Sequence, residues 1–323
     1  MCQKISILIL ILEWILETMN IKEFDVVLLT QKEYANPTKI NPYIENILLE
    51  DKLLTIALQT KGLKVTRTHW DDESFAWESG QFALFRATWD YFHRFTEFHA
   101  WLNKCSQKIH FINPYPVIQW NVDKQYLADL KIKGINIPCT IFLAKGSQIT
   151  LEQALVDTQW ERVILKPAIG GAARHTYQLD NNQLEKYEPV FQQLIAGESM
   201  LLQEFQRNIL TNGEVSHMIF GGKYSHAVLK KTKAGDFRVQ DDFGGTVHPY
   251  YASTQEREFV EQVITQCPHK PVYARVDVMW DNHNNLCVSE LELIEPELWL
   301  RKEEKSAQSF AQAVIEHMKL FAS

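Results

Sequence analysis

Residues 272–294 read VYARVDVMWDNHNNLCVSELELI, two apolar runs joined by a polar loop rich in Asn, and this stretch decides the fold. Side chains alternate along a strand, so Arg275 and Asp277 fall on one face of the first run. Glu290 and Glu292 likewise share one face of the second run. The pattern predicts a β-hairpin that carries three acidic side chains.

The acidic side chains of this hairpin repel one another, so a partner that compensates their charge is expected. Two carboxylates side by side on a strand repel each other unless a cation or a proton intervenes. With a third acid from the neighbouring strand they form an oxygen-rich site suited to Mg²⁺, which prefers carboxylates together with substrate phosphates. Asp277 faces the same side as Glu290 only if the loop has an even length, as the four residues Asn282–Asn285 would give, or if a bulge intervenes. The alternative is a solvated polar face on an edge hairpin.

The first 118 residues or so predict a doubly wound, mainly parallel sheet, because strands and helices alternate there. The expected strands are short apolar runs, and the helices have apolar positions at helical spacing. Gly62 is expected to end the first helix as a C-terminal cap. The strands are Phe24–Leu29, Leu63–Arg67 and Phe82–Phe85, and the helices include Ile44–Leu58 and Phe95–Leu102.

The chain leaves this first unit at two prolines, Pro114 and Pro116. We expect a helix to follow, opened by Asn121 as its N-cap and closed near Gly134. Two further strands are predicted, and a Gly-rich segment, residues 168–173, comes directly after the second of them. These strands are Thr140–Leu143 and Arg162–Lys166.

The last third of the chain is predicted to be richer in β-structure. Gly221-Gly222 lies between two apolar runs, residues 216–220 and 223–230, which is a strong signal for a two-residue hairpin turn. Ser253 and Glu256 form a capping box at the start of a helix. A closing helix carries its apolar side chains on one face: Phe310, Val314, Ile315, Met318 and Phe321.

Composition and charge exclude several classes of protein. A chain of 323 residues predicts two or three packed units, and a net charge of −7 argues against a general nucleic-acid binder. Five widely spaced cysteines indicate free thiols in a reducing compartment, so we expect a cytoplasmic protein. The apolar start Ile5–Leu16 is interrupted by Glu13 and is too short for a membrane helix or a good signal peptide. Residues 1–18, which precede a second candidate start at Met19, are either without a role in catalysis or form a packed helix.

Two lysines are candidates for binding phosphate. Lys124 is expected three residues into the helix that begins at Asn121, where it opposes the helix dipole unless an anion lies nearby. Lys166 ends an apolar strand directly before Gly170 and Gly171, which let backbone N–H groups approach a ligand. An exposed lysine and a plain Gly-Gly turn are the alternatives. Neither a dinucleotide fingerprint nor a Walker-type phosphate loop is present.

A second basic group lies further along the chain. Lys230, Lys231 and Arg238 surround the segment Asp236–Arg238, and Gly244-Gly245 follows. Three cations beside a Gly-containing loop could neutralise a phosphoryl group during its transfer. Solvated surface charges are the more common alternative.

Taken in order, these segments resemble the ATP-grasp superfamily from about Asn113 to Glu297, and they are most similar to prokaryotic glutathione-synthetase-like ligases. The fold that this resemblance implies is an α/β ATP-grasp fold with an α+β lid. The segments that carry the resemblance are Asp123-Lys124, Leu165-Lys166-Pro167, the Gly-rich segment, Gln203-Glu204-Phe205, Arg275-Val276-Asp277, Glu290-Leu291-Glu292 and Glu295-Pro296.

The resemblance implies a role for each matching residue. Lys124, Lys166 and the two glycines Gly170 and Gly171 would contact ATP. Gln203, Glu204 and Phe205 would form the segment that reads adenine, with Glu204 accepting from its amino group. Glu214 resembles an acid that binds ribose. Lys230, Arg238 and Arg275 are the candidate catalytic cations, with Arg238 holding the γ-phosphate or acyl phosphate. Asp277, Glu290 and Glu292 would carry two Mg²⁺ ions, with Mn²⁺ as a substitute.

The sequence departs from the family pattern at Glu292, where glutathione synthetases have Asn, which leaves metal affinity and pH dependence open. The segment Phe85–Tyr91 is similar to one in the branch that contains O-ureido-serine cyclo-ligase. Within it, the planar fork of Arg86 could clamp a substrate carboxylate. Trp89 and Tyr91 are either pocket walls or core aromatics.

The function implied is a Mg²⁺- and ATP-dependent carboxylate–amine ligase that acts through an acyl phosphate on a small amino-acid-like substrate. The alternatives are a small-molecule kinase on the same scaffold and an ATP-binding regulatory module without turnover. We expect no nucleic-acid or membrane partner, and a homo-oligomer is compatible with the resemblance. The predicted domains are residues 1–119 before the ATP-grasp unit, a central lid at 120–205, and a C-terminal subdomain with the metal site at 206–323.

Overall fold

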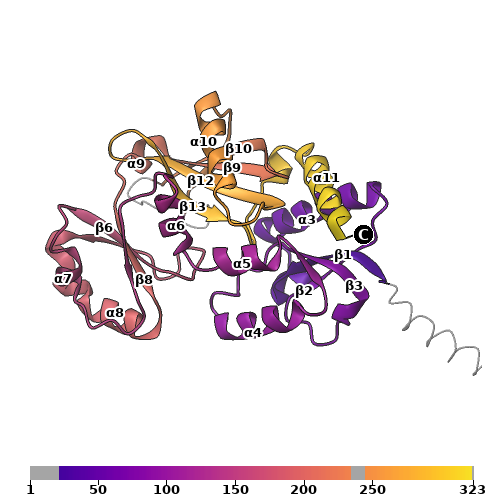
Figure 1. Ribbon diagram of the computed structural model, residues 1–323, viewed down its shortest axis with the longest axis horizontal. Helices are drawn as coiled ribbons and strands as arrows, with labels where there is room; N and C mark the ends of the chain where they lie inside the picture. Colours follow the sequence, from indigo (N-terminus) through magenta and orange to yellow (C-terminus); the bar gives the residue numbers. More distant parts are fainter. Residues whose placement is uncertain (1–21, 234–243, 322–323) are drawn as a thin grey trace, which may run out of the picture.

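The computed structural model describes residues 22–233 and 244–321, arranged around three β-sheets (Figure 1). Residues 1–18 and Arg238 lie outside the described residues, so the expectations for them stay predictions. Within the described part of the chain, no helix has the length and apolar character needed to cross a membrane.

The first sheet is entirely parallel, with strand order β2-β1-β3-β4, which confirms the predicted doubly wound unit. Helices pack against it, and the α3 helix begins after Asn41, whose side chain accepts from the N–H of Ile44. The α3 helix is followed by Gly62 at φ +87°, as predicted. The elements are β1 (Phe24–Thr30), α2 (Lys32–Ala35), α3 (Pro42–Thr60), β2 (Val65–His69), η1 (Trp77–Ser79), β3 (Gly80–Phe85), α4 (Phe95–Cys105) and β4 (His110–Ile112).

This sheet packs tightly because its central strands are apolar on both faces. Val26 to Leu29 are fully buried, as expected of a strand covered on two sides. Gly80 begins β3 where a Cβ would lie 2.7 Å from the side chains of both Val27 and Ile109. Only glycine therefore fits at that point without a shift of the neighbouring side chains.

The helix predicted over 121–134 is wrong at its start. Two short helices occupy the region, α5 (Tyr115–Asn121) and α6 (Tyr126–Ile132), so Asn121 ends a helix where we expected it to open one. Its side chain is engaged elsewhere, because it donates to the carbonyl of Leu291 and accepts from the N–H of Leu293. The end near Gly134 is as predicted, at φ +85°.

The second sheet is antiparallel, with order β5-β8-β6-β7, and its β5 and β6 strands lie where the sequence predicted them. Figure 1 shows α7 and α8 with this sheet in a lobe of their own. A core of buried apolar side chains, including Leu165 and Phe191, joins the sheet to α8. The elements are β5 (Thr140–Leu143), α7 (Leu151–Leu155), β6 (Arg162–Pro167), β7 (Tyr177–Asp180), η2 (Asn181–Gln183), α8 (Leu184–Gly197) and β8 (Met200–Glu204).

The third sheet is antiparallel, with order β11-β10-β9-β12-β13. The predicted Gly221-Gly222 turn joins β9 to β10 with φ of +60° and +80°, and the Ser253–Glu256 capping box opens α10. The elements are α9 (Ile209–Asn212), β9 (Glu214–Phe220), β10 (Lys223–Lys231), β11 (Thr246–Tyr250), α10 (Thr254–Thr265), β12 (Tyr273–Trp280), β13 (Leu286–Glu292), η4 (Leu300–Lys302), α11 (Ser306–Met318) and η5 (Lys319–Phe321).

The loop of the acidic hairpin differs from the predicted four residues. The β12 and β13 strands end at Trp280 and Leu286, which pair with each other, so five residues connect them. An odd loop alone would place Asp277 opposite Ser289. A bulge between Asp277 and Val278 shifts the register, so that Asp277 pairs with Glu290. The second of the two predicted routes therefore brings these acids to one face.

Among the described residues, no strand neighbours the outer edge of β13, and polar side chains from residues 113–136 bond its backbone instead. Asn121 bonds Leu291 and Leu293, as described above, and the Tyr126 hydroxyl accepts from the N–H of Leu291. Asn136 donates its amide to the carbonyl of Leu286. These bonds satisfy an otherwise open strand edge and fix the strand that carries Glu290 and Glu292.

The first and third sheets share one core. The α11 helix packs on α3, as Figure 1 also shows, and the rings of Phe310 and Phe220 stack with centroids 4.8 Å apart. Phe310 and Val314 are buried on the predicted face of α11, whereas Phe321 is partly exposed. The domain boundaries at residues 119 and 205 stay a prediction.

Candidate active site

A cleft of about 260 Å³ lies where the second and third sheets meet, and it gathers most of the predicted site residues. Its lining comes from strands of both sheets and from the Gly-rich segment. The predicted residues that line it are Lys124, Lys166, Gly170, Gly171, Gln203, Glu214, Lys230, Arg275, Asp277, Glu290 and Glu292.

Asp277 is the centre of a buried ionic network in this cleft. It is 2% exposed, and both of its carboxylate oxygens accept hydrogen bonds. Arg275 donates to both oxygens, from Nε at 2.9 Å and from Nη2 at 2.8 Å. Ser216 donates to Oδ1 at 2.6 Å, and Lys230 donates to Oδ2 at 3.0 Å. Burial opposes ionisation, but Arg275 and Lys230 hold the pKa of Asp277 well below its usual range.

Lys230 joins a second acid to the network. It is 4% exposed, and its Nζ lies 2.5 Å from Glu214 Oε1. The other Glu214 oxygen accepts from Ser289 Oγ at 2.6 Å. Ser289 also donates to the Asp277 carbonyl at 3.1 Å, next to the bulge in the hairpin. Strands β9, β10, β12 and β13 therefore each contribute to one network.

The two glutamates of β13 face different cations. Glu290 Oε1 lies 3.1 Å from Lys124 Nζ, and Glu292 Oε1 bonds Arg275 Nη2. Burial raises the pKa of Glu292 to about 8, helped by the charges of Glu290 and Asp277 although Arg275 opposes it. The pKa of Glu290 shifts the other way, because Lys124 and Lys166 outweigh the effect of burial. Glu292 is thus the acid of the hairpin whose negative charge its surroundings stabilise least.

Lys124 is not on a helix as predicted. It lies in the turn between α5 and α6, where its backbone N–H donates to the Ala168 carbonyl at 2.9 Å. Its Nζ donates to the Gly170 carbonyl in addition to pairing with Glu290. The expected clash with a helix dipole is therefore wrong, and the lysine instead connects the Gly-rich segment with the acidic hairpin.

Lys166 and the segment after it form one wall of the cleft. Burial lowers the pKa of Lys166 to about 8; Glu290 opposes this shift and Lys124 adds to it. In the following loop, Ala172, Ala173 and His175 have φ between +47° and +54°, a left-handed region that such residues rarely adopt. Strained backbone of this kind gathers at ligand-binding segments.

The charges of the cleft fit a divalent cation. Among the described residues, no three His, Cys, Asp or Glu side chains lie close enough together to hold a metal ion as they stand. Asp277 has both oxygens engaged by protein donors, whereas Glu290 and Glu292 each bond a cation through one oxygen only, within the part of the chain that the structure describes. Their second oxygens are the kind of ligand that Mg²⁺ prefers.

The three residues expected at the adenine end are placed differently from one another. Gln203 lines the cleft and donates its amide to Thr140 Oγ1 at 3.0 Å. Glu204 and Phe205 lie beyond the cleft lining. Asn282 donates to both of them, to Glu204 Oε1 at 3.2 Å and to the Phe205 carbonyl at 3.0 Å. Gln203 therefore lines the same cleft as Lys124 and Lys166. Glu204 and Phe205 are instead bonded by Asn282, in the loop of the acidic hairpin.

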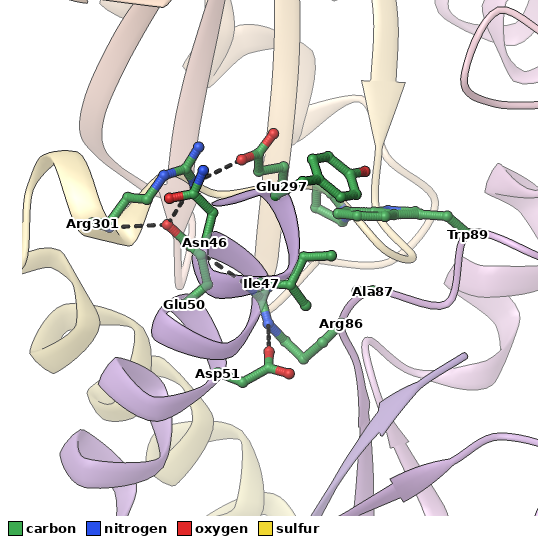
Figure 2. A pocket seen from close by; sticks show the side chains of 11 residues that line it. Asn46, Ile47, Glu50, Asp51, Arg86, Ala87, Trp89, Glu297 and Arg301 are labelled. Atoms are coloured by element: carbon green, nitrogen blue, oxygen red, sulfur yellow. Dashed lines mark hydrogen bonds and ion pairs between the residues drawn. The ribbon is translucent and has the colours of Figure 1, made fainter. Parts of the chain in front are cut away.

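Arg86 lines a second, smaller pocket next to the cleft, shown in Figure 2. It is 4% exposed, and its Nε lies 3.3 Å from Asp51, toward which Figure 2 shows it turned. Its Nη2 lies 3.7 Å from Glu50, and its Nη1 is buried without a hydrogen bond. Trp89 lines both the pocket and the cleft, so the two are adjacent. Arg86 is thus held by acids of α3, with one donor left over.

Several residues of the site were not predicted. Ser216 and Ser289 bond the network, and a signal for Ser216 was its position two residues after Glu214 on the same strand face. Ser289 could not be placed without the bulge. Trp299 has no such signal, yet its ring lies within 6 Å of Lys230 and Arg275.

Comparison with known proteins finds similarity along nearly the whole chain. Residues 14–113 match the family described as the N-terminal domain of D-cycloserine synthetase DcsG. The cycloserine biosynthesis protein DcsG of Streptomyces lavendulae is 28% identical over 281 residues, which cover 81% of this chain and 92% of that protein.

Solved structures extend this similarity to the fold. The crystal structure of D-cycloserine synthetase DcsG matches with a TM-score of 0.79 and 26% identity, over 90% of this chain and 99% of that one. The ATP-grasp ligase PsnB, solved with a minimal precursor, Mg and ADP, matches with a TM-score of 0.59 and 14% identity, over 91% and 98%. The second match concerns the fold alone. The chain has the ATP-grasp fold, and its relatives of that fold are ligases.

Proposed function

We propose that this chain is an ATP-dependent ligase that joins a carboxylate to an amine through an acyl phosphate. The observation that carries the proposal is the meeting of four cations with three hairpin acids in one cleft. The cations are Lys124, Lys166, Lys230 and Arg275, and the acids are Asp277, Glu290 and Glu292. The similarity to a protein named as a synthetase, D-cycloserine synthetase DcsG, supports the same reaction class.

ATP is assigned to the wall formed by the second sheet. Lys124 and Lys166 line the cleft and would bind phosphate oxygens, together with backbone N–H groups of the Gly-rich segment, which lines the same cleft. Gln203 would lie toward the base and Glu214 toward the ribose. Glu204 and Phe205 would contact adenine only through their backbone, since their side chains lie outside the cleft lining.

Mg²⁺ is assigned to Glu290 and Glu292, with Asp277 completing the site. When bound, the metal would supply positive charge that offsets the charge of the ATP phosphates and of the cleft's carboxylates. Binding by Asp277 would require Arg275 or Lys230 to release one of its oxygens. Two ions, and Mn²⁺ in place of Mg²⁺, are part of this proposal.

The chain's own residues contribute position and charge to the reaction. A carboxylate oxygen of the substrate attacks the γ-phosphorus of ATP, the bond to the β,γ-bridging oxygen breaks, and ADP leaves. An amine then attacks the acyl carbon, inorganic phosphate leaves and the amine loses a proton. Arg275, Lys230 and Arg238 are assigned to the charge that builds up on the phosphoryl oxygens. Phosphoryl transfer needs little covalent help from protein, which suits a cleft of cations and acids.

The substrate is assigned to the end of the cleft that adjoins the second pocket. Arg86 has one buried donor without a partner there, and Trp89 provides an apolar wall. The cleft, with a volume of about 260 Å³, suits a small amino-acid-like molecule rather than a long polymer. Relatives named for the synthesis of cycloserine, a small molecule, support this size class.

The test is ADP release over a panel of amino acids and amines, with and without hydroxylamine. A ligase releases ADP with a subset of the panel and yields a hydroxamate, because hydroxylamine intercepts the acyl phosphate. Glu290→Ala should lose activity by roughly a hundredfold or more, whereas Glu261→Ala, an exposed acid on α10, should behave as the unchanged protein.

Two other outcomes would contradict the proposal. ADP release that gives a stable phosphorylated product and no hydroxamate indicates a kinase. ATP binding without ADP release for any member of the panel indicates a module without turnover.

A further inference from the structure

Trp299 occupies an unusual place beside the proposed catalytic cations. Its side chain is 3% exposed, and its backbone has φ +46° and ψ +39°, in the left-handed region. A bulky residue in that region is a genuine outlier whose backbone is strained. Such a conformation persists only where the surrounding structure determines it.

The surrounding bonds do determine it. On one side, His226 Nε2 lies 3.0 Å from the carbonyl of Leu298. On the other, both carboxylate oxygens of Glu50, a residue of α3, accept from the backbone N–H groups of Leu300 and Arg301 at 2.9 Å. The segment that contains Trp299 is therefore fixed from the third sheet and from the N-terminal unit at once.

The result of this fixed bend is an indole placed against two cations. The ring centroid lies 5.3 Å from Arg275 Cζ and 5.9 Å from Lys230 Nζ. The indole N–H is buried without a hydrogen-bond partner in the described structure. Trp299 therefore contacts the two cations with its ring and not with its N–H group. The face of an aromatic ring attracts positive charge electrostatically.

We infer that Trp299 is a positioning residue that holds Arg275 and Lys230 on the proposed phosphoryl-transfer site by cation–π contact. Both cations are bonded to Asp277, and one of them would have to release an oxygen of this carboxylate when ATP and metal enter. The indole face offers them an attraction that does not depend on the acids. It therefore keeps two like charges side by side and directed into the cleft while their ion pairs rearrange.

This inference rests on the proposed function only for its effect on turnover. The contact itself has a readout that needs no substrate: the Nε–H resonance of Arg275 in a ¹⁵N-labelled sample, assigned by its loss in Arg275→Lys. Ring current from the indole should shift this resonance upfield, and Trp299→Leu should remove the shift. An Arg275 resonance that is the same in both proteins would overturn the contact, whatever the enzyme catalyses.

The kinetic test separates the aromatic ring from the volume that it fills. Trp299→Leu should lower kcat and kcat/KM for ATP by a similar factor, roughly tenfold, because the held cations act in the transition state. Trp299→Phe should recover most of this loss. Trp299→Leu with an unchanged kcat, or Trp299→Phe as impaired as Trp299→Leu, would overturn the inference.

Two controls keep a structural defect apart from a positioning defect. Trp101→Leu removes another tryptophan with a buried, unpartnered N–H, but in the aromatic cluster of the first sheet. It should lower the unfolding midpoint and leave kcat per folded molecule unchanged. If Trp299→Leu does not fold, Trp299→Met is compared with Trp299→Phe, and equal kcat values for the two would count against the inference. Absence of ADP release from the unsubstituted protein would instead refute the proposed function.

Discussion

Lys166 is the residue at which the physical chemistry of the cleft should be easiest to measure. It lies next to the last residue of β6, in surroundings that lower its pKa to about 8, against 10.5 for a free lysine. Burial is the main cause; Lys124 adds to it, and Glu290 and Glu214 oppose it. A lysine carries its charge below its pKa, so this one loses the charge near pH 8 as the pH rises.

We therefore predict that kcat/KM for ATP falls as the pH passes through about 8, since this ratio reports the ionisation of the free enzyme. Lys166→Arg should move the fall to higher pH, because a guanidinium stays protonated. The measurement is the pH profile of kcat/KM. Lys223→Arg, at an exposed lysine of β10, should keep the original profile, and identical profiles for Lys166→Arg and the unsubstituted protein would contradict the role.

At this scale, residue types were predictable from the sequence but their partners were not. Alternation along two strands placed Asp277, Glu290 and Glu292 on candidate faces. Nothing in the sequence indicated that Arg275 would bond both Asp277 and Glu292, or that Lys124 would pair with Glu290. These pairs depend on how separate strands are brought together, which no local pattern encodes.

The edge of β13 is the element on which the acidic hairpin depends. Side chains from α5, α6 and the residues after them bond its backbone where a further strand would otherwise lie. Asn121 contributes two of these bonds and is buried. Removing its side chain leaves buried backbone groups without partners, which costs more stability than removing both partners of a hydrogen bond.

We predict that Asn121→Ala lowers the free energy of unfolding by about 1–3 kcal/mol, measured by chemical denaturation. Asn182→Ala, at an exposed asparagine of η2, should stay within about 0.5 kcal/mol. Equal unfolding curves for the two variants would show that the edge bonds do not fix β13.

Elements were predictable where the signal is local. The Gly221-Gly222 turn, the Ser253–Glu256 capping box and the apolar strands of the first sheet each depend on a few neighbouring residues. The helix expected from Asn121 failed because this side chain bonds a strand 170 residues away. The predicted four-residue length of the hairpin loop was wrong. The register is set by a bulge instead, and no local sequence pattern indicates where a bulge lies.

On the scale of the molecule, the N-terminal unit is tied into the site. Glu50 of α3 bonds the backbone of Leu300 and Arg301 directly after Trp299, and Arg86 lies beside the same acid. The α11 helix returns from the third sheet to pack on α3. The spacing of apolar residues predicted α3 and α11. The packing of one helix on the other joins residues far apart in the sequence, so the core shared by the first and third sheets was not predictable.

In the proposed reaction, a substrate carboxylate takes the γ-phosphoryl group of ATP, and an amine then attacks the acyl carbon and displaces inorganic phosphate. The most direct test uses the carboxylate found in the ADP-release panel, labelled with ¹⁸O in its carboxyl group, and mass spectrometry of the phosphate released. An acyl phosphate that is attacked at carbon passes one carboxylate oxygen to phosphate, so the account predicts one ¹⁸O in each phosphate. Unlabelled phosphate formed at the same rate as the amide would contradict it.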